Sequence, residues 1–167
     1  AVAAIVGASR GYRELVESAT NGIYAVAALV TLSSFCLFWA LVTRDFRVQY
    51  VSQYTSVDLP LPYTISAFWA GQEGSLLLWA WLLAIASGVA VWQSREQHRR
   101  LIPYVVATLS TLLAFFGLLT SFVSDPFVQL AWAPGDGRGL NPLLENPGMV
   151  IHPPAVFLGY VGFAIPF

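Results

Sequence analysis

The sequence has 167 residues, of which 57% are hydrophobic and 10% charged, and its formal net charge is −1. This composition excludes an ordinary soluble domain, in which about a quarter of the residues are charged. Every cation is an arginine, and the arginines lie singly or in one short cluster, so the chain offers no basic patch for nucleic acid. We therefore expect a membrane protein that does not bind nucleic acid.

Apolar segments long enough to cross a bilayer follow one another along the chain. A spanning helix needs roughly 20 mostly apolar residues, because the hydrocarbon core is about 30 Å thick. Residues 22–43, 74–94 and 101–124 contain no charge and have polar or charged flanks. Residues 1–8 and 153–167 are interpreted as two further spans that are truncated. We expect an all-α polytopic transmembrane helix bundle that forms the N-terminal portion of a single larger membrane domain.

The connections between these segments alternate in length and charge. Residues 9–21 and 95–100 are short and carry five arginines, whereas the loops 44–73 and 125–152 carry three arginines and six acidic residues. Because arginine favours the cytoplasmic side, the two long loops are predicted to be extracytoplasmic, and periplasmic in a bacterial inner membrane. Function concentrates in long loops of this kind. His98, in the second short connection, is interpreted as a solvated histidine.

The first long loop interleaves aromatic and polar residues, including Tyr50, and aromatic rings in such a setting favour the headgroup layer of a membrane. Residues 63–69 are predicted to form a short interfacial helix with Ile65, Phe68 and Trp69 on one face. The second long loop has turn-forming proline and glycine residues and no helical or strand period, so we expect it to be irregular.

The stretch "FWAGQEGSLLLW", residues 68–79, places small and polar residues where a span begins. Gly71 and Gly74 permit a tight turn or the close approach of another group. Glu73 at a helix N-terminus would be stabilised by the helix dipole by about 0.3–1 kcal/mol. The functional alternative is a set of residues that organises a ligand pocket or an adjacent loop, since ionisable residues at membrane depth are costly. The residues of that set in this stretch are Trp69, Gly71, Gln72, Glu73, Gly74 and Ser75.

The other candidate feature is His152, in "NPGMVIHPPAVFLGY". A neutral imidazole binds metals and can bind haem iron axially. Pro153 and Pro154 are tolerated at a helix start, so they predict a span that begins near Pro153 and holds the ring rigidly at its outer end. The alternative is a histidine that caps its own helix. Arg138 and Asn141, in the second long loop, are assigned to the pocket or loop; Arg138 suits a carboxylate or propionate, or a local contact with the aspartate two residues before it.

These clusters together resemble the CcmF family, the haem-lyase subunit of the cytochrome c maturation machinery. The similar segments are "RDFRVQYVSQYTSVDLPLPYTISAFWAGQEGSLLLW" and "DGRGLNPLLENPGMVIHPPAVFLGYVGF", with Ala70 where the family usually has glycine. The resemblance implies that haem is presented between a Trp-rich segment and two extracytoplasmic histidines, of which His152 matches the first and would be an axial ligand of the iron. It also implies a haem b held inside the membrane by two histidines of later helices.

By the same resemblance, the parent protein would be a haem lyase of cytochrome c-type biogenesis in a bacterial inner membrane. Its cofactor would be haem, in the b form before attachment. Its partners would be membrane lipid, the remaining helices of the same protein, apocytochrome c, and the haem chaperone and apocytochrome delivery subunits. The Trp-rich segment and the other histidines are expected beyond Phe167, so this part of the protein alone is expected to be inactive.

Two other functions remain open at this point. A transporter or channel module would use Glu73, Gly71 and Gly74 in a broken-helix substrate site, although no span carries a charge in its middle. A structural scaffold without haem would dock partner subunits through the long loops, with His152 incidental. Paired discontinuous helices would favour the transporter, and the absence of haem absorbance in the intact protein would favour the scaffold.

Overall fold

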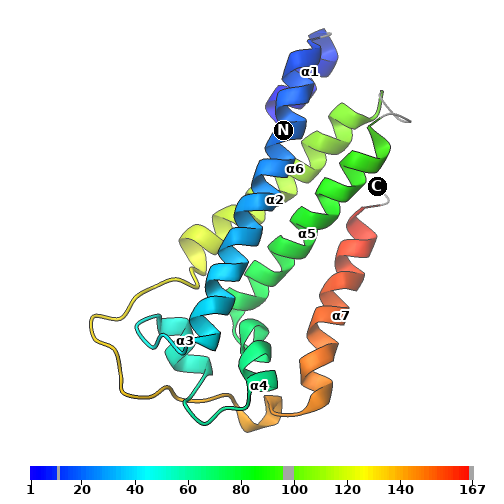
Figure 1. Ribbon diagram of the computed structural model, residues 1–167. Coiled ribbons are helices and arrows are strands. Elements are labelled where there is room, and N and C mark those ends of the chain that lie inside the picture. Colours follow the sequence, from blue (N-terminus) through cyan, green and yellow to red (C-terminus); the bar gives the residue numbers. More distant parts are fainter. Residues whose placement is uncertain (11, 96–99, 166–167) are drawn as a thin grey trace.

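The computed structural model describes residues 1–10, 12–95 and 100–165, and within these ranges the chain is helical, without a named strand (Figure 1). This confirms the predicted all-α fold. The helices, in chain order, are α1 (Val2–Arg10), α2 (Arg13–Val42), α3 (Gln49–Tyr54), α4 (Leu61–Ser66), η1 (Ala67–Trp69), α5 (Gln72–Ser94), α6 (Ile102–Leu118), η2 (Leu119–Val123), η3 (Pro142–Leu144) and α7 (Pro147–Ala164).

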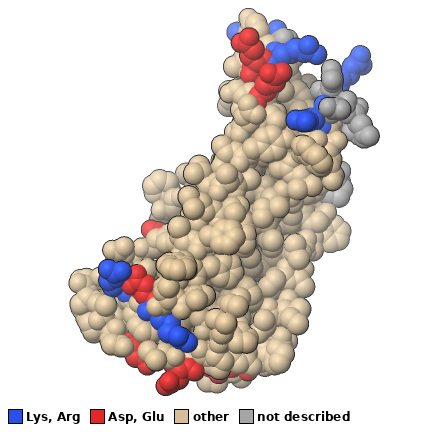
Figure 2. Space-filling model, viewed as in Figure 1, with Lys and Arg blue, Asp and Glu red and all other residues tan. Residues whose placement is uncertain are grey.

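Three helical stretches are long and apolar enough to cross a membrane: α2, α5, and α6 continued by the π-helical η2. Figure 2 shows that the Arg, Asp and Glu side chains on the visible face gather at the two ends of the molecule and leave its middle uncharged. These features confirm the predicted transmembrane bundle. Paired discontinuous helices, which would favour the transporter alternative, are not found in the described part of the chain.

The first short connection differs from the prediction. Residues 9–21 are not a loop, because α1 ends at Arg10 and α2 already begins at Arg13. The segment "RELVESA" contains no glycine or proline and is rich in good helix formers. The helix therefore continues beyond the apolar segment, toward the charged end of the bundle. The second short connection joins α5 to α6, and His98 lies outside the described residues.

A hydrophobic core joins the long helices along the bundle. It includes Ala4, Ile23, Leu83, Val91 and Val106, which come from α1, α2, α5 and α6 and are all nearly inaccessible to solvent. Helix α7 contributes one buried residue, Val161, to this core, and the partly buried Ala164 packs against it. Helices α1, α2, α5 and α6 therefore share one interior, whereas α7 lies at its side (Figure 1).

The first long loop folds into a second core, and we call residues 44–71 the loop platform. Here α3, α4 and η1 close over the ends of α2 and α5. The predicted interfacial helix is present as α4 and η1, but its predicted face is wrong: Phe68 is completely buried and Ile65 is 38% exposed. Phe68 turns inward because it stacks on Phe38 of α2, with ring centroids 4.3 Å apart. Tyr50 is also buried, so its assignment to the headgroup layer is wrong as well.

Up to Asn146 the second long loop is irregular, as predicted, apart from the short helix η3, and it lies against the loop platform at the same end of the bundle (Figure 1). Residues 147–152, which were also predicted to be irregular, belong to α7 instead. Gln49 N–H donates to Val128 O over 2.8 Å, and Arg138 N–H donates to Ser52 O over 2.8 Å. Gly137 approaches the chain of α3 so closely that a Cβ there would collide with the carbonyl oxygen of Thr55. The two long loops therefore form one folded layer.

Candidate functional site

Helix α7 begins earlier than predicted, at Pro147. The side chain of Asn146 accepts a hydrogen bond from Met149 N–H over 3.1 Å, which is an N-cap interaction, and Pro147 occupies the first helical position. The prediction that Pro153 and Pro154 start this helix is therefore wrong, because an asparagine cap followed by proline already starts it. That Asn-Pro pair is the sequence signal that locates the true start.

Pro153 and Pro154 lie inside α7 as a consequence. A proline has no N–H, so the carbonyl groups four residues earlier, on Met149 and Val150, lose their helical donors. Trp69 of η1 supplies a substitute: its indole N–H donates to Met149 O over 3.2 Å. This hydrogen bond connects the two sequence clusters, which are 80 residues apart along the chain.

His152 is the sixth residue of α7 and its side chain is exposed. Within residues 1–10, 12–95 and 100–165, no group hydrogen-bonds its ring, so the alternative of a histidine that caps its own helix gains no support. The same part of the chain contains no group of three or more His, Cys, Asp or Glu residues that could hold a metal ion. An iron bound by this ring would therefore need its other ligands from a porphyrin and from residues outside the described ranges.

The glycines of the first cluster permit a close approach, as predicted. Gly71 caps α5, and its N–H donates to the hydroxyl of Tyr50 over 3.0 Å. That hydroxyl lies 2.9 Å from Ala67 O, to which it can donate in turn. A Cβ on Gly74 would collide with the carbonyl oxygen of Phe68 and with the Tyr50 hydroxyl. Burial raises the pKa of the Tyr50 phenol, so this group stays a neutral donor.

The polar residues of the first cluster tie neighbouring segments together. Ser75 Oγ donates to Trp69 O over 2.9 Å, and Gln72 Nε2 donates to Ser124 Oγ at the end of η2 over 3.3 Å. Glu73 lies in the first turn of α5, as predicted for a residue that interacts with the helix dipole. Its Oε2 atom is buried and has no hydrogen-bond partner among the described residues. These contacts join α5 to η1 and to η2, and the assignment of Trp69, Gln72 and Ser75 to a pocket or loop stays a prediction.

Arg138 and Asn141 lie in the second long loop and do not hydrogen-bond α7 within the described ranges. Asn141 caps η3, since its side chain accepts from Leu143 N–H over 3.0 Å. The side chain of Arg138 is exposed and forms no ion pair with Asp136, whose carboxylate accepts from Val57 N–H over 2.8 Å. The local pairing considered for Arg138 is therefore absent, and its guanidinium group faces solvent.

The sequence analysis missed two structural details of this candidate site. Tyr50 holds the turn into α5, but a tyrosine in a polar loop carries no pattern that predicts burial. The Met149 carbonyl lacks a helical donor only because Pro153 lies inside a helix. Predicting this from the sequence requires that the helix start at Pro147 is located first.

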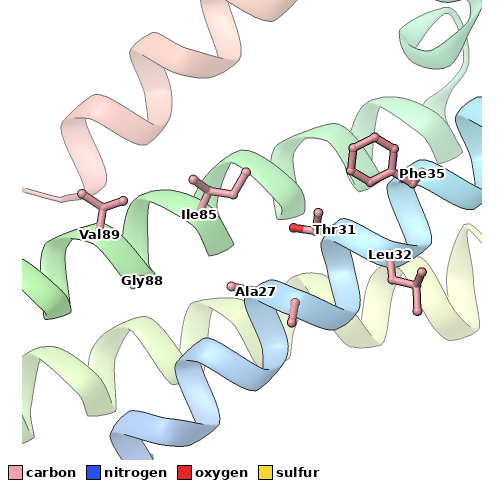
Figure 3. A pocket seen from close by; sticks show the side chains of 8 residues that line it. Ala27, Thr31, Leu32, Phe35, Ile85, Gly88 and Val89 are labelled. Atoms are coloured by element: carbon pink, nitrogen blue, oxygen red, sulfur yellow. The ribbon is translucent and has the colours of Figure 1, made fainter.

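A separate groove lies between α2 and α5, and none of the residues of these clusters lines it (Figure 3). It has a volume of about 570 Å³ and its walls are almost entirely apolar. Small residues in its lining, such as Ala27, Ala28 and Gly88, permit the close approach of another apolar group. Its lining residues are Ala27, Ala28, Thr31, Leu32, Phe35, Ile85, Gly88 and Val89.

Apolar helices of membrane-spanning length, an uncharged middle and a folded loop layer at one end define a multi-pass membrane protein. The chain belongs to the family described as Cytochrome C assembly protein, whose model matches residues 69–167. The match begins at Trp69 and includes α5, α6 and α7. The resemblance noted from the sequence is thereby confirmed.

Curated relatives agree with this assignment. The chain is 35% identical to the cytochrome c-type biogenesis protein CcmF of Haemophilus influenzae over 96% of its own length and 25% of the relative. It is 40% identical to CycK of Rhizobium meliloti over 98% of its length, and 40% identical to a probable biogenesis protein, NrfE, of Escherichia coli over 86%. The chain thus spans about a quarter of the length of these relatives. No solved structure matches it.

Proposed function

We propose that this chain is part of a cytochrome c-type biogenesis protein that presents haem for thioether attachment to apocytochrome c, with His152 as an axial ligand of the haem iron. The family match and the CcmF and NrfE relatives support the general function. The observation that carries the ligand role is the exposed His152 ring, which has no hydrogen-bond partner among the described residues. A neutral imidazole with a free nitrogen is a suitable iron ligand.

Thioether attachment of haem mainly requires that the two reacting groups are held in position. Haem is the substrate, and in thioether formation the thiol of a reduced apocytochrome cysteine adds across a haem vinyl group: the sulfur bonds to one vinyl carbon and the hydrogen goes to the other. No atom is lost, so a protein accelerates this step by holding vinyl and thiol in register. An imidazole on the iron sets the position of the porphyrin. His152, Pro153 and Pro154 form the part of α7 that would lie beside it.

The orientation that fits this function places the loop platform and the second long loop in the periplasm of a bacterial cell. Four described arginines, Arg10, Arg13, Arg95 and Arg100, lie at the end with the short connections, which supports a cytoplasmic location for that end. The opposite end would then meet apocytochrome c, a haem chaperone and the subunits that deliver the apocytochrome. Arg138, exposed in the loop layer, is suited to a haem propionate.

The test is a His152→Ala substitution in the intact protein, in its native membrane. We expect a loss of extracytoplasmic haem and of mature c-type cytochrome, because the iron loses one axial nitrogen. His98→Ala, the substitution of the only other histidine of the chain, is the matched control and should leave both quantities unchanged. Unchanged cytochrome maturation in the His152→Ala protein would remove the assignment.

A further inference from the structure

We propose that Trp69 is a positioning residue for His152: its indole N–H holds the Met149 carbonyl that Pro153 leaves without a helical donor, and so fixes the first part of α7. The inference rests on the proposed ligand role of His152. It assigns to the first cluster a task that sequence patterns alone do not show, since Trp69 acts through the backbone of a helix 80 residues away.

The need for an outside donor comes from the prolines. In an uninterrupted helix the N–H of residue 153 would donate to Met149 O, and Pro153 has no N–H. Sharp bends in helices occur at prolines because this bond is missing. Two adjacent prolines directly after His152 therefore weaken α7 at the place where the ligand is attached.

Trp69 is itself held firmly, which makes it an effective donor. Its neighbour Phe68 is completely buried and stacks on Phe38 of α2 at an interplanar angle of 19°. The carbonyl oxygen of Trp69 accepts from Ser75 Oγ over 2.9 Å. The indole N–H thus projects from the loop platform, whose position is set by the bundle core.

Helix α4 also contacts α7, but no residue in the first half of α7, residues 147–156, is buried. The buried Val161 lies in the second half of the helix. The contacts of Trp79 with α7 also involve the second half, namely the rings of Phe157 and Tyr160 at centroid distances of 5.6 Å. Met149 precedes His152 by three residues and lies on nearly the same side of the helix. A hydrogen bond to Met149 O therefore controls the position of the His152 ring more directly than these contacts.

The contact can be tested without haem, by amide hydrogen exchange of the intact, haem-free protein in nanodiscs. Trp69→Phe keeps an aromatic ring and removes the donor, so the amides of residues 150–152 should exchange about tenfold faster, as expected for one lost hydrogen bond. Trp132→Phe is the matched control, because Trp132 is 74% exposed in the second long loop. Unchanged exchange in Trp69→Phe would overturn the inference.

A second substitution separates the hydrogen bond from general packing. Pro153→Ala returns an N–H to position 153, which can donate to Met149 O within the helix. In that background Trp69→Phe should change the exchange of residues 150–152 by less than about twofold, because the indole donor is then redundant. An equal effect in both backgrounds would show that Trp69 acts through packing alone and would overturn the inference.

The haem-loaded protein distinguishes this inference from the proposed function. Trp69→Phe should make the haem several-fold easier to displace from His152 by added imidazole, as read from the absorbance spectrum. In a His152→Gly protein supplied with imidazole, Trp69→Phe should have no effect, because the free ligand no longer depends on α7. If His152→Ala alters the haem spectrum and Trp69→Phe does not, the inference fails and the proposed function stands. If His152→Ala leaves the haem spectrum unchanged, the proposed function fails and the positioning role fails with it.

Discussion

The loop platform and α7 form the two sides of the candidate site, and they are constructed in opposite ways. The platform buries Tyr50, Val51 and Phe68 and packs its backbone closely against Gly74. Helix α7 has 18 residues, of which only Val161 is buried. One side of the site is therefore a rigid support, and the other is an exposed helix that is attached to it at few points.

The difference has a physical basis in what each side must do. A histidine that binds haem, as proposed for His152, has to remain accessible, so the residues around it cannot be buried. The position of the histidine then has to be set by a neighbouring segment that is well packed. In this protein, the hydrogen bond from Trp69 to Met149 O connects the platform to α7.

The largest expected effect tests the packing of the platform. Phe68→Ala in the intact protein should lower the free energy of unfolding by about 3–5 kcal/mol, because a fully buried, stacked ring is replaced by a cavity. Phe163→Ala removes the same ring from α7, where it is 77% exposed, and should cost less than about 1 kcal/mol. Unfolding in mixed detergent micelles measures both. Equal losses would mean that α7 is packed as tightly as the platform.

A somewhat smaller effect tests the close approach at the start of α5. Gly74→Ala should cost about 1–3 kcal/mol, because the added Cβ collides with a backbone carbonyl and with the Tyr50 hydroxyl, neither of which can move freely. Gly22→Ala is the control, since nothing lies within 4 Å of a Cβ at that helical position. Thermal unfolding in detergent compares the two. An unchanged stability of the Gly74→Ala protein would show that the platform moves easily to accommodate the added Cβ.

The smallest expected effect concerns the start of α7. Asn146→Ala removes the side-chain cap from Met149 N–H and should weaken the first turn of α7 by about 1 kcal/mol. The change should appear as faster amide exchange at residues 148–150 with little change in global unfolding, because the platform does not depend on α7. Asn141→Ala, which removes the corresponding cap of η3, should leave those amides unaffected. A large global loss with Asn146→Ala would contradict the separation of the two sides.

Much of the architecture follows from local patterns. Uncharged segments at 22–43, 74–94 and 101–124 locate the long helices to within a few residues at most of their ends, because a polar backbone in hydrocarbon has only its own helix as partner. The exception is the beginning of α2 at Arg13, where water replaces hydrocarbon and helix propensity alone decides the boundary. The importance of Gly71 and Gly74 was also predictable, since small residues at a turn indicate a close approach.

Which residues come together at the candidate site depends on long-range packing. The sequence places Trp69 and His152 in two separate clusters and fixes neither the inward turn of Phe68 nor the burial of Tyr50. Those features arise when α4 and η1 fold onto the end of α2, which involves residues far apart in the chain. The sequence by itself determined a helical membrane bundle and its family, because hydropathy and local motifs are short-range properties. Only the tertiary structure decided that a tryptophan of one loop meets the carbonyl freed by a proline of another helix, because that contact exists only after both segments have packed against the same core.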